Sequence, residues 1–196
     1  MKKIFYIIGK STTGKDHFYE DILAQEELAL VPLVMYTTRP MREGEEDGCE
    51  YHFVSEEKYE EFRAGNRIIE ERTYQTVHGP WHYFTVDDGS LDLEHNNYLA
   101  IGTLESYGGV RAHFGEDRLV PLYIEVRDDI RLIRTIERER KQEQPNYAEI
   151  CRRFLADDAD FAEKKIREAG ITRRFENNGE YADCLQELLQ YIRTVI

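Results

Sequence analysis

The chain has 196 residues, 41% of them hydrophobic and 33% charged, and its formal net charge is −13. This length suits one domain with a buried core, and the negative charge argues against sequence-independent nucleic-acid binding, which needs a basic surface. The three cysteines stand far apart and no apolar run reaches the roughly eighteen residues of a membrane span, so we expect a cytoplasmic protein without disulfides, a zinc cluster or a membrane partner.

The first motif covers residues 9–16, Gly-Lys-Ser-Thr-Thr-Gly-Lys-Asp, and has the G-x-x-x-x-G-K spacing of a phosphate-binding loop. An apolar strand is expected before it at residues 3–9, and a helix is expected to begin near Gly14. Backbone N–H groups, the helix N-terminus and a lysine would then face the phosphates of a nucleotide. The hydroxyl residues between the glycines serve as phosphate contacts or only as loop spacers. The predicted nucleotide-binding residues are Gly9, Ser11, Thr12, Thr13, Gly14 and Lys15.

Asp16 follows the lysine, at a position where phosphate loops usually carry a serine or threonine whose hydroxyl binds Mg²⁺. A carboxylate is a hard oxygen ligand that suits Mg²⁺. We therefore expect either that Asp16 holds the metal or that the metal site is built differently.

The next segment contains a possible phosphate clamp. An apolar run at residues 28–35 is expected to form a second strand, and the polar segment after it contains Arg39 and Arg42. Two guanidinium groups in a loop after a strand can hold a phosphate, although a solvated loop explains these charges equally well.

Residues 37–53 resemble the signature of the guanylate kinase family, with the pattern Thr-Thr-Arg-x-x-Arg-x-Gly-Glu-x-x-Gly-x-x-Tyr-x-Phe. In that family the signature lies one helix and one strand after the phosphate loop, as it does here. The resemblance implies that Arg39, Arg42 and Tyr51 hold the phosphate of GMP.

A candidate base-binding strand follows a short helix expected at residues 56–63. In the β-prone run of residues 67–77, Glu70 and Arg72 share one side. A carboxylate can accept hydrogen bonds from both N1–H and the 2-amino group of guanine, whereas adenine lacks this donor pair, so Glu70 is expected to read the base. The family has a glutamate here and then a Tyr-Gly-Ser/Thr turn. Similarity to that turn implies that Tyr83 and Thr85 complete the GMP site.

The chain departs from the family pattern at three places. Residues 74–83 are about two residues longer than in the family, and Met35 and Tyr36 stand where it often has serines, which implies a reshaped guanine pocket. At the end of a predicted strand the family usually has an aspartate that binds Mg²⁺ through water. This chain has Gly-Thr there, at residues 102–103, and no aspartate. We hypothesise that Asp16 replaces this missing charge.

A predicted helix after residue 127 carries Arg131, Arg134 and Arg138 along one side. A solvated, salt-bridged face would explain this pattern, but in an acidic chain it also suggests a lid whose arginines close over the transferring phosphoryl group. The family has such a helix with an Arg-x-x-x-Arg pattern, matched by Arg134 and Arg138, and a later arginine, matched by Arg152 or Arg153.

The last elements are a polar helical segment at residues 156–168, a short strand at residues 171–175 and a helix whose apolar residues between positions 181 and 196 share one face. We expect this final helix to pack in the core. Before it, Asn177 stands where the family often has an asparagine near the adenine of ATP.

Alternating strands and helices after a phosphate loop predict an α/β fold, in which a parallel sheet is flanked by helices as in P-loop NTPases. We expect one domain. Its core would comprise residues 1–34, 86–133 and 159–196, with a nucleoside-monophosphate-binding lobe at about 35–85 and a lid at about 134–158.

The resemblance implies an enzyme that transfers the γ-phosphoryl group of Mg·ATP to GMP or dGMP. Its partners would be small-molecule nucleotides, and its catalytic residues would be Lys15, Arg42, Arg134, Arg138 and Arg153. One alternative keeps the chemistry but changes the acceptor to another nucleotide, a nucleoside or a sugar phosphate. A second alternative is a non-catalytic guanylate-kinase-like binding module.

Overall fold

The computed structural model describes residues 1–76 and 79–196, and its centre is a five-stranded parallel sheet in the order β2-β7-β1-β8-β9. The strands are β1 Ile4–Ile8, β2 Leu30–Pro32, β7 Asn97–Gly102, β8 Leu119–Glu125 and β9 Arg174–Glu176. The prediction of a parallel sheet flanked by helices is therefore confirmed.

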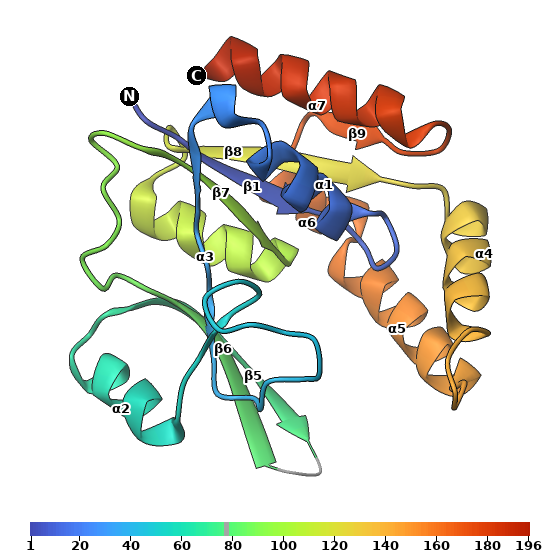
Figure 1. Ribbon diagram of the computed structural model, residues 1–196, viewed down its shortest axis with the longest axis horizontal. Helices are drawn as coiled ribbons and strands as arrows, with labels where there is room; N and C mark the ends of the chain where they lie inside the picture. Colours follow the sequence, from blue (N-terminus) through green and yellow to red (C-terminus); the bar gives the residue numbers. More distant parts are fainter. Residues whose placement is uncertain (77–78) are drawn as a thin grey trace.

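Helices cover both faces of this sheet (Figure 1). The helices α1 (Lys15–Leu23) and α7 (Tyr181–Val195) pack on one face, where Phe5 and Ile7 of β1 point. The helices α3 (Leu104–Phe114) and α6 (Glu163–Glu168) pack on the other face. Successive side chains of a strand point to opposite faces, and both faces of β1 are covered, so the whole strand has to be apolar. The apolar run predicted at this position in the sequence meets that requirement.

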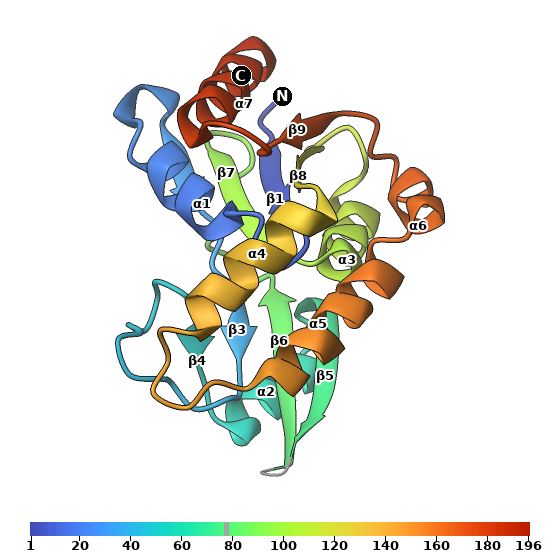
Figure 2. The same cartoon turned by 90° about the vertical axis from the view of Figure 1, so that its right-hand side faces the viewer.

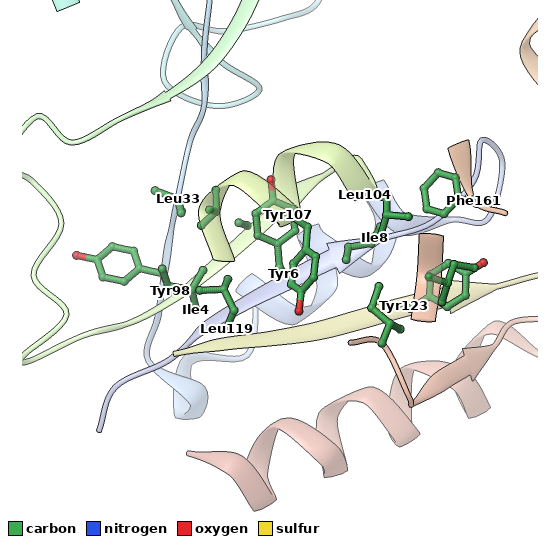
Figure 3. Close-up of a cluster of buried hydrophobic side chains, with 14 of the residues drawn as sticks. Ile4, Tyr6, Ile8, Leu33, Tyr98, Leu104, Tyr107, Leu119, Tyr123 and Phe161 are labelled. Atoms are coloured by element: carbon green, nitrogen blue, oxygen red, sulfur yellow. The ribbon is translucent and has the colours of Figure 1, made fainter. Parts of the chain in front are cut away.

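Figure 3 shows the core on the α3 face of the sheet. There the alternate β1 residues Ile4, Tyr6 and Ile8 meet Leu104 and Tyr107 of α3, and all five side chains are buried. Core packing of this kind fixes the carboxyl end of β1, and with it the start of the phosphate loop.

A second, four-stranded sheet in the order β4-β3-β6-β5 projects from the central sheet together with α2 (Glu56–Ala64) (Figure 1). Its strands are β3 Tyr36–Thr37, β4 His52–Phe53, β5 Ile68–Thr76 and β6 Gly79–Val86. β6 pairs antiparallel with β3 and β5, while β3 and β4 are parallel. The β-prone run predicted at residues 67–77 is thus a strand, although position 77 lies outside the described residues.

Beyond the carboxyl end of β8, α4 (Asp128–Glu139) and α5 (Tyr147–Asp160) pack against each other (Figure 2). Among residues 1–76 and 79–196, no helix is long and apolar enough to cross a membrane.

Three local expectations were wrong. The run at 28–35 is not one strand, because Leu28 ends a 3₁₀ turn (η1, Glu26–Leu28) and strand pairing is confined to Leu30–Pro32, where the proline lies in an edge strand. The helix expected at 156–168 breaks at Phe161, whose side chain turns into the core. The final apolar position, Ile196, lies beyond the end of α7 and is exposed.

The second sheet packs on the core through α3, and the contact between α3 and β5 is tight at Gly109. A Cβ atom added at Gly109 would overlap the Cβ atom of Glu70 in β5, whereas one added at the neighbouring Gly108 would have no atom within 4 Å. The absence of a side chain at Gly109 therefore sets how closely the second sheet packs on the core.

Gly109→Ala should force α3 and β5 apart, because the added methyl group has no space. Overpacking of this kind costs about 1–3 kcal/mol, so we expect the melting temperature to fall by about 5 °C. The control Gly108→Ala puts a better helix former at an open position and should leave the melting temperature equal or higher. Equal melting temperatures for the two variants in a circular dichroism scan would contradict this packing account.

An ion pair between Arg39 and Glu45 fixes the loop between β3 and β4. Both terminal nitrogens of Arg39 donate to the Glu45 carboxylate, at 2.7 and 2.6 Å, and the backbone N–H of Arg42 donates to it at 2.7 Å. The buried guanidinium also lies near the rings of Tyr51 and Phe53, at 5.3 and 5.2 Å from their centroids. Hydrogen bonds from Arg39 lower the pKa of Glu45 from 4.5 to about 2.

This lowered pKa links loop stability to pH. A carboxylate whose pKa is depressed in the folded state stabilises the fold fully above its unfolded pKa of 4.5, and that stabilisation is lost as the pH falls toward 2. We expect Glu45→Gln to reduce the free energy of unfolding at neutral pH and to flatten its decline between pH 4.5 and pH 2, as followed by urea titration. Glu43→Gln, at an exposed position of the same loop, should keep the wild-type pH dependence.

Candidate active site

A cavity of about 920 Å³ lies between the phosphate loop, the second sheet and α5. This volume is in the usual range for a small-molecule site. Six of the residues proposed from the sequence line it together: Gly9, Ser11, Lys15, Asp16, Tyr51 and Arg153. Donor-side and acceptor-side candidates therefore face one space.

The phosphate loop runs from the end of β1 to the start of α1. Gly14 has φ of 90° and caps α1, and Lys15 is the first residue of that helix. A Cβ atom at Gly9 would lie 2.7 Å from Thr13 Oγ1 and 2.9 Å from a backbone oxygen of β8. Both glycines are thus required by geometry, and Thr12 completes the turn with φ of 62°.

Asn177 joins the end of β9 to this loop. It is 3% exposed, its Nδ2 donates to the backbone oxygen of Thr13 at 3.0 Å, and its own backbone oxygen accepts from Arg134 Nη2 at 3.1 Å. Within the described residues its buried Oδ1 has no hydrogen-bond partner. A buried acceptor without a partner is costly, so this atom suits a donor group of a ligand.

The lid was expected to present Arg131 to the phosphates, and that expectation was wrong. Arg131 is 1% exposed, and its guanidinium donates to the backbone oxygen of Ser11 at 3.1 Å and to the carboxylates of Asp128 and Asp157 at 2.7 Å each. Asp157 also accepts from the backbone N–H of Ser11 at 2.8 Å. Since α4 starts directly after β8, its first turn packs on the phosphate loop. Nothing in the local sequence pattern marked Asp157 as the partner.

Asp128 lies in the first turn of α4, and Arg127 takes the N-cap position.

The other lid arginines lie closer to solvent. Arg138 is exposed and lines a small cavity of about 50 Å³ between α4 and α5, which Arg153 also lines. Of the two arginines that could match the later family position, Arg152 is held by Glu149 at 2.7 Å, while Arg153 Nη2 lies 3.5 Å from Ser11 Oγ. Arg153 is therefore the one that faces the phosphate loop.

The proposed acceptor-phosphate residues gather on the second sheet. Tyr51 and Tyr83 have ring centroids 5.5 Å apart, and Arg39 lies beside Tyr51. Burial raises the pKa of the Tyr51 hydroxyl, which keeps it a neutral hydrogen-bond donor at pH 7. Arg42 is exposed on the same loop.

The proposed base-reading residue, Glu70, is already paired. Its carboxylate accepts from Arg72 Nε at 3.1 Å and from Thr85 Oγ1 at 2.8 Å, and the side chains of Glu70 and Arg72 are each 6% exposed. Arg72 lines the cavity and is a site residue that the sequence analysis did not propose. Its place on the same side of the strand as Glu70 was the available signal.

The residues at the loop fit a magnesium ion carried by a nucleotide. The Asp16 side chain is 76% exposed, and its carboxylate lies 3.9 Å from Lys15 Nζ. No group of three or more His, Cys, Asp or Glu side chains within the described part of the chain could hold a metal ion. One carboxylate beside phosphate oxygens and waters is the ligand set that Mg²⁺ commonly uses.

Comparison with known proteins gives consistent similarities. The model of the family described as guanylate kinase matches residues 1–81. The guanylate kinase of Neisseria gonorrhoeae is 34% identical over 121 residues, which are 62% of this chain and 57% of that protein. The guanylate kinase of Cupriavidus metallidurans is 28% identical over 158 residues, which are 78% of this chain and 67% of that protein.

A solved structure shows the same fold. The crystal structure of guanylate kinase from Anaplasma phagocytophilum matches with a TM-score of 0.65 at 16% identity, and the match covers 98% of this chain and 85% of that one. The chain spans 57% of the length of the Neisseria gonorrhoeae relative. The family match contains the phosphate loop, the Arg39–Glu45 loop and β5, which supply part of the site described above. The chain is thus similar to guanylate kinases, in the family model over residues 1–81 and in fold over 98% of its length.

Proposed function

We propose that the protein is a nucleoside monophosphate kinase that transfers the γ-phosphoryl group of Mg·ATP to GMP or dGMP. The carrying observation is that Lys15 of the phosphate loop and Tyr51 of the acceptor-side cluster line one cavity. Donor and acceptor phosphates can therefore meet inside it. The attacking oxygen of a nucleoside monophosphate is already anionic, so the reaction needs charge and positioning rather than a general base.

On the donor side, Lys15 and the backbone of the loop would hold the β- and γ-phosphates of ATP. The unpaired Oδ1 of Asn177 suits the 6-amino group of adenine, which is a donor. Asp16 would hold Mg²⁺, and the ion would offset negative charge on the phosphates.

On the acceptor side, Arg42, Tyr51 and Tyr83 would bind the phosphate of GMP, and Arg39 would support them. Arg39 is held in one orientation by Glu45, so its role is to support the Tyr51 ring and to add positive charge at short range. Arg42 is exposed and free to reach a bound phosphate.

Closure would exclude water, which would otherwise accept the phosphoryl group. We assign this to a nucleoside-monophosphate-binding lobe at residues 35–85 and a lid at residues 134–158, with the remaining chain as core. Arg134, Arg138 and Arg153 would move toward the transferring group as the lid closes.

A second candidate keeps this chemistry with another acceptor. It is favoured by the pairing of Glu70 with Arg72, because a carboxylate engaged by a guanidinium is a weaker reader of guanine donors. We place the reaction in the cytoplasm, where all three cysteines, which are free, would remain reduced.

The first test is ADP release by the purified protein with Mg·ATP and each nucleoside monophosphate in turn. We expect turnover with GMP and dGMP, and we expect Lys15→Met to lower kcat by at least about a hundredfold, because a cation at the transferring phosphates is lost. Lys164→Met, which removes an 81% exposed lysine of α6, is the matched control and should leave kcat unchanged. Absence of turnover with every acceptor would reject the kinase assignment and support a binding module.

The metal assignment is tested separately. Asp16→Ala should raise the Mg²⁺ concentration for half-maximal rate by about tenfold, because a direct carboxylate ligand is lost. Glu26→Ala removes an exposed carboxylate just beyond α1, at a residue that does not line the cavity, and should leave the Mg²⁺ dependence as it is. If the Mg²⁺ titration of Asp16→Ala matches that of the wild type, Asp16 is not the metal ligand.

A further inference from the structure

The wall of the acceptor site carries a guanidinium group where a bare carboxylate was expected. We infer that Arg72 is a specificity-determining residue, that it recognises the 6-oxo group of the acceptor's purine base, and that Glu70 acts by positioning Arg72. The inference rests on the proposed kinase function, since it concerns the acceptor subsite of the same cavity.

The first step is the state of Glu70. Its carboxylate accepts from Arg72 Nε and Nη2, at 3.1 and 3.5 Å, and from Thr85 Oγ1 at 2.8 Å. Its side chain is 6% exposed, and α3 packs over it at Gly109. Glu70 is absent from the residues that line the cavity, whereas Arg72 is among them. A ligand in the cavity therefore meets the guanidinium before the carboxylate.

The second step is the unused donor capacity of Arg72. Nη1 lies 3.3 Å from Thr103 Oγ1, and Nη2 lies 3.4 Å from Met35 Sδ. A guanidinium has five N–H donors, and a thioether sulfur is only a weak acceptor. Within the described residues, Nη2 donates only to the sulfur and, in the long contact, to Glu70, while the hydroxyl of Tyr74, which also lines the cavity, lies within hydrogen-bonding reach of the same guanidinium. An oxygen acceptor on a ligand would satisfy Nη2.

The third step is the chemistry of the bases. Guanine and hypoxanthine carry an oxygen acceptor at C6, whereas adenine carries an amino donor there. A guanidinium would bind the 6-oxo group and would face an adenine amino group donor to donor. Because Glu70 is engaged by Arg72, the 2-amino group of guanine should contribute little. If Arg72 recognises the base, it binds the 6-oxo group of guanine. If Glu70 recognises the base, it binds N1–H and the 2-amino group.

Nucleotide analogues that each lack one group of guanine can distinguish recognition by Arg72 from recognition by Glu70 in the wild-type protein. Inosine monophosphate keeps the 6-oxo group and lacks the 2-amino group, and 2-aminopurine ribonucleoside monophosphate has the reverse pattern. We expect calorimetric dissociation constants of GMP and IMP for the wild-type protein within about tenfold of each other. We expect AMP and the 2-aminopurine nucleotide to bind at least about a hundredfold more weakly, because they leave a buried donor unpaired.

Variants then assign the effect to residues. Arg72→Met should remove the preference for GMP and IMP over AMP, and Arg72→Lys, which keeps the charge, serves if the methionine variant folds poorly. Glu70→Gln should weaken GMP and IMP equally, since it acts through Arg72. A KM for ATP like that of the wild type would show that the donor site is intact.

The outcomes separate this inference from the kinase proposal, because binding is measured apart from turnover. Binding of the 2-aminopurine nucleotide as tight as that of GMP, or an Arg72→Met protein that keeps its base preference, would overturn the role of Arg72 while GMP turnover still stood. If Glu70→Gln weakens the binding of GMP but not of IMP, Glu70 itself recognises the base. Selective binding of GMP and IMP without any ADP release would reject the kinase proposal and support the role of Arg72.

Discussion

The buried guanidinium of Arg131 joins three parts of the chain that lie far apart in sequence. It contacts the backbone oxygen of Ser11 in the phosphate loop, Asp128 in the first turn of α4 and Asp157 in α5. A charge removed from water needs such partners, and removal of one partner of a buried pair is strongly destabilising. The phosphate loop and the start of the lid are therefore held as one unit, and any lid motion must occur beyond Arg131 or break this network.

Three buried arginines of this acidic chain are each held by a carboxylate. Arg39, Arg72 and Arg131 are all under 10% exposed, and each donates to at least one Asp or Glu side chain at 3.1 Å or less. Pairing fixes their orientation but cancels much of their charge. Positive charge for a polyphosphate must then come mainly from cations with weaker partners, of which Lys15 and Arg153 line the cavity.

The sequence predicted the features that depend on local patterns. It missed the features that depend on how helices and sheets pack against one another. The phosphate loop and the apolar strand before it follow from glycine spacing and hydrophobicity within a dozen residues. The helical repeat likewise placed Arg131, Arg134 and Arg138 on one side of α4. Which of them is buried depends on how α4 meets α5 and the loop, and Asp157 lies 26 positions away from Arg131. The pairing of Arg72 with Met35 and Thr103 is hidden for the same reason, because it needs the second sheet to pack on α3.

The departures from the family pattern in the base pocket are physically coupled. Met35 stands where the family often has a serine, and Thr103 stands near the strand end where it usually has an aspartate. Both side chains contact the guanidinium of Arg72. The Arg72–Glu70 pair makes this wall of the cavity neutral overall, and Arg72 points hydrogen-bond donors toward the ligand. A carboxylate alone would offer the ligand hydrogen-bond acceptors instead. We therefore interpret the three positions as parts of one change in hydrogen-bond polarity, centred on Arg72.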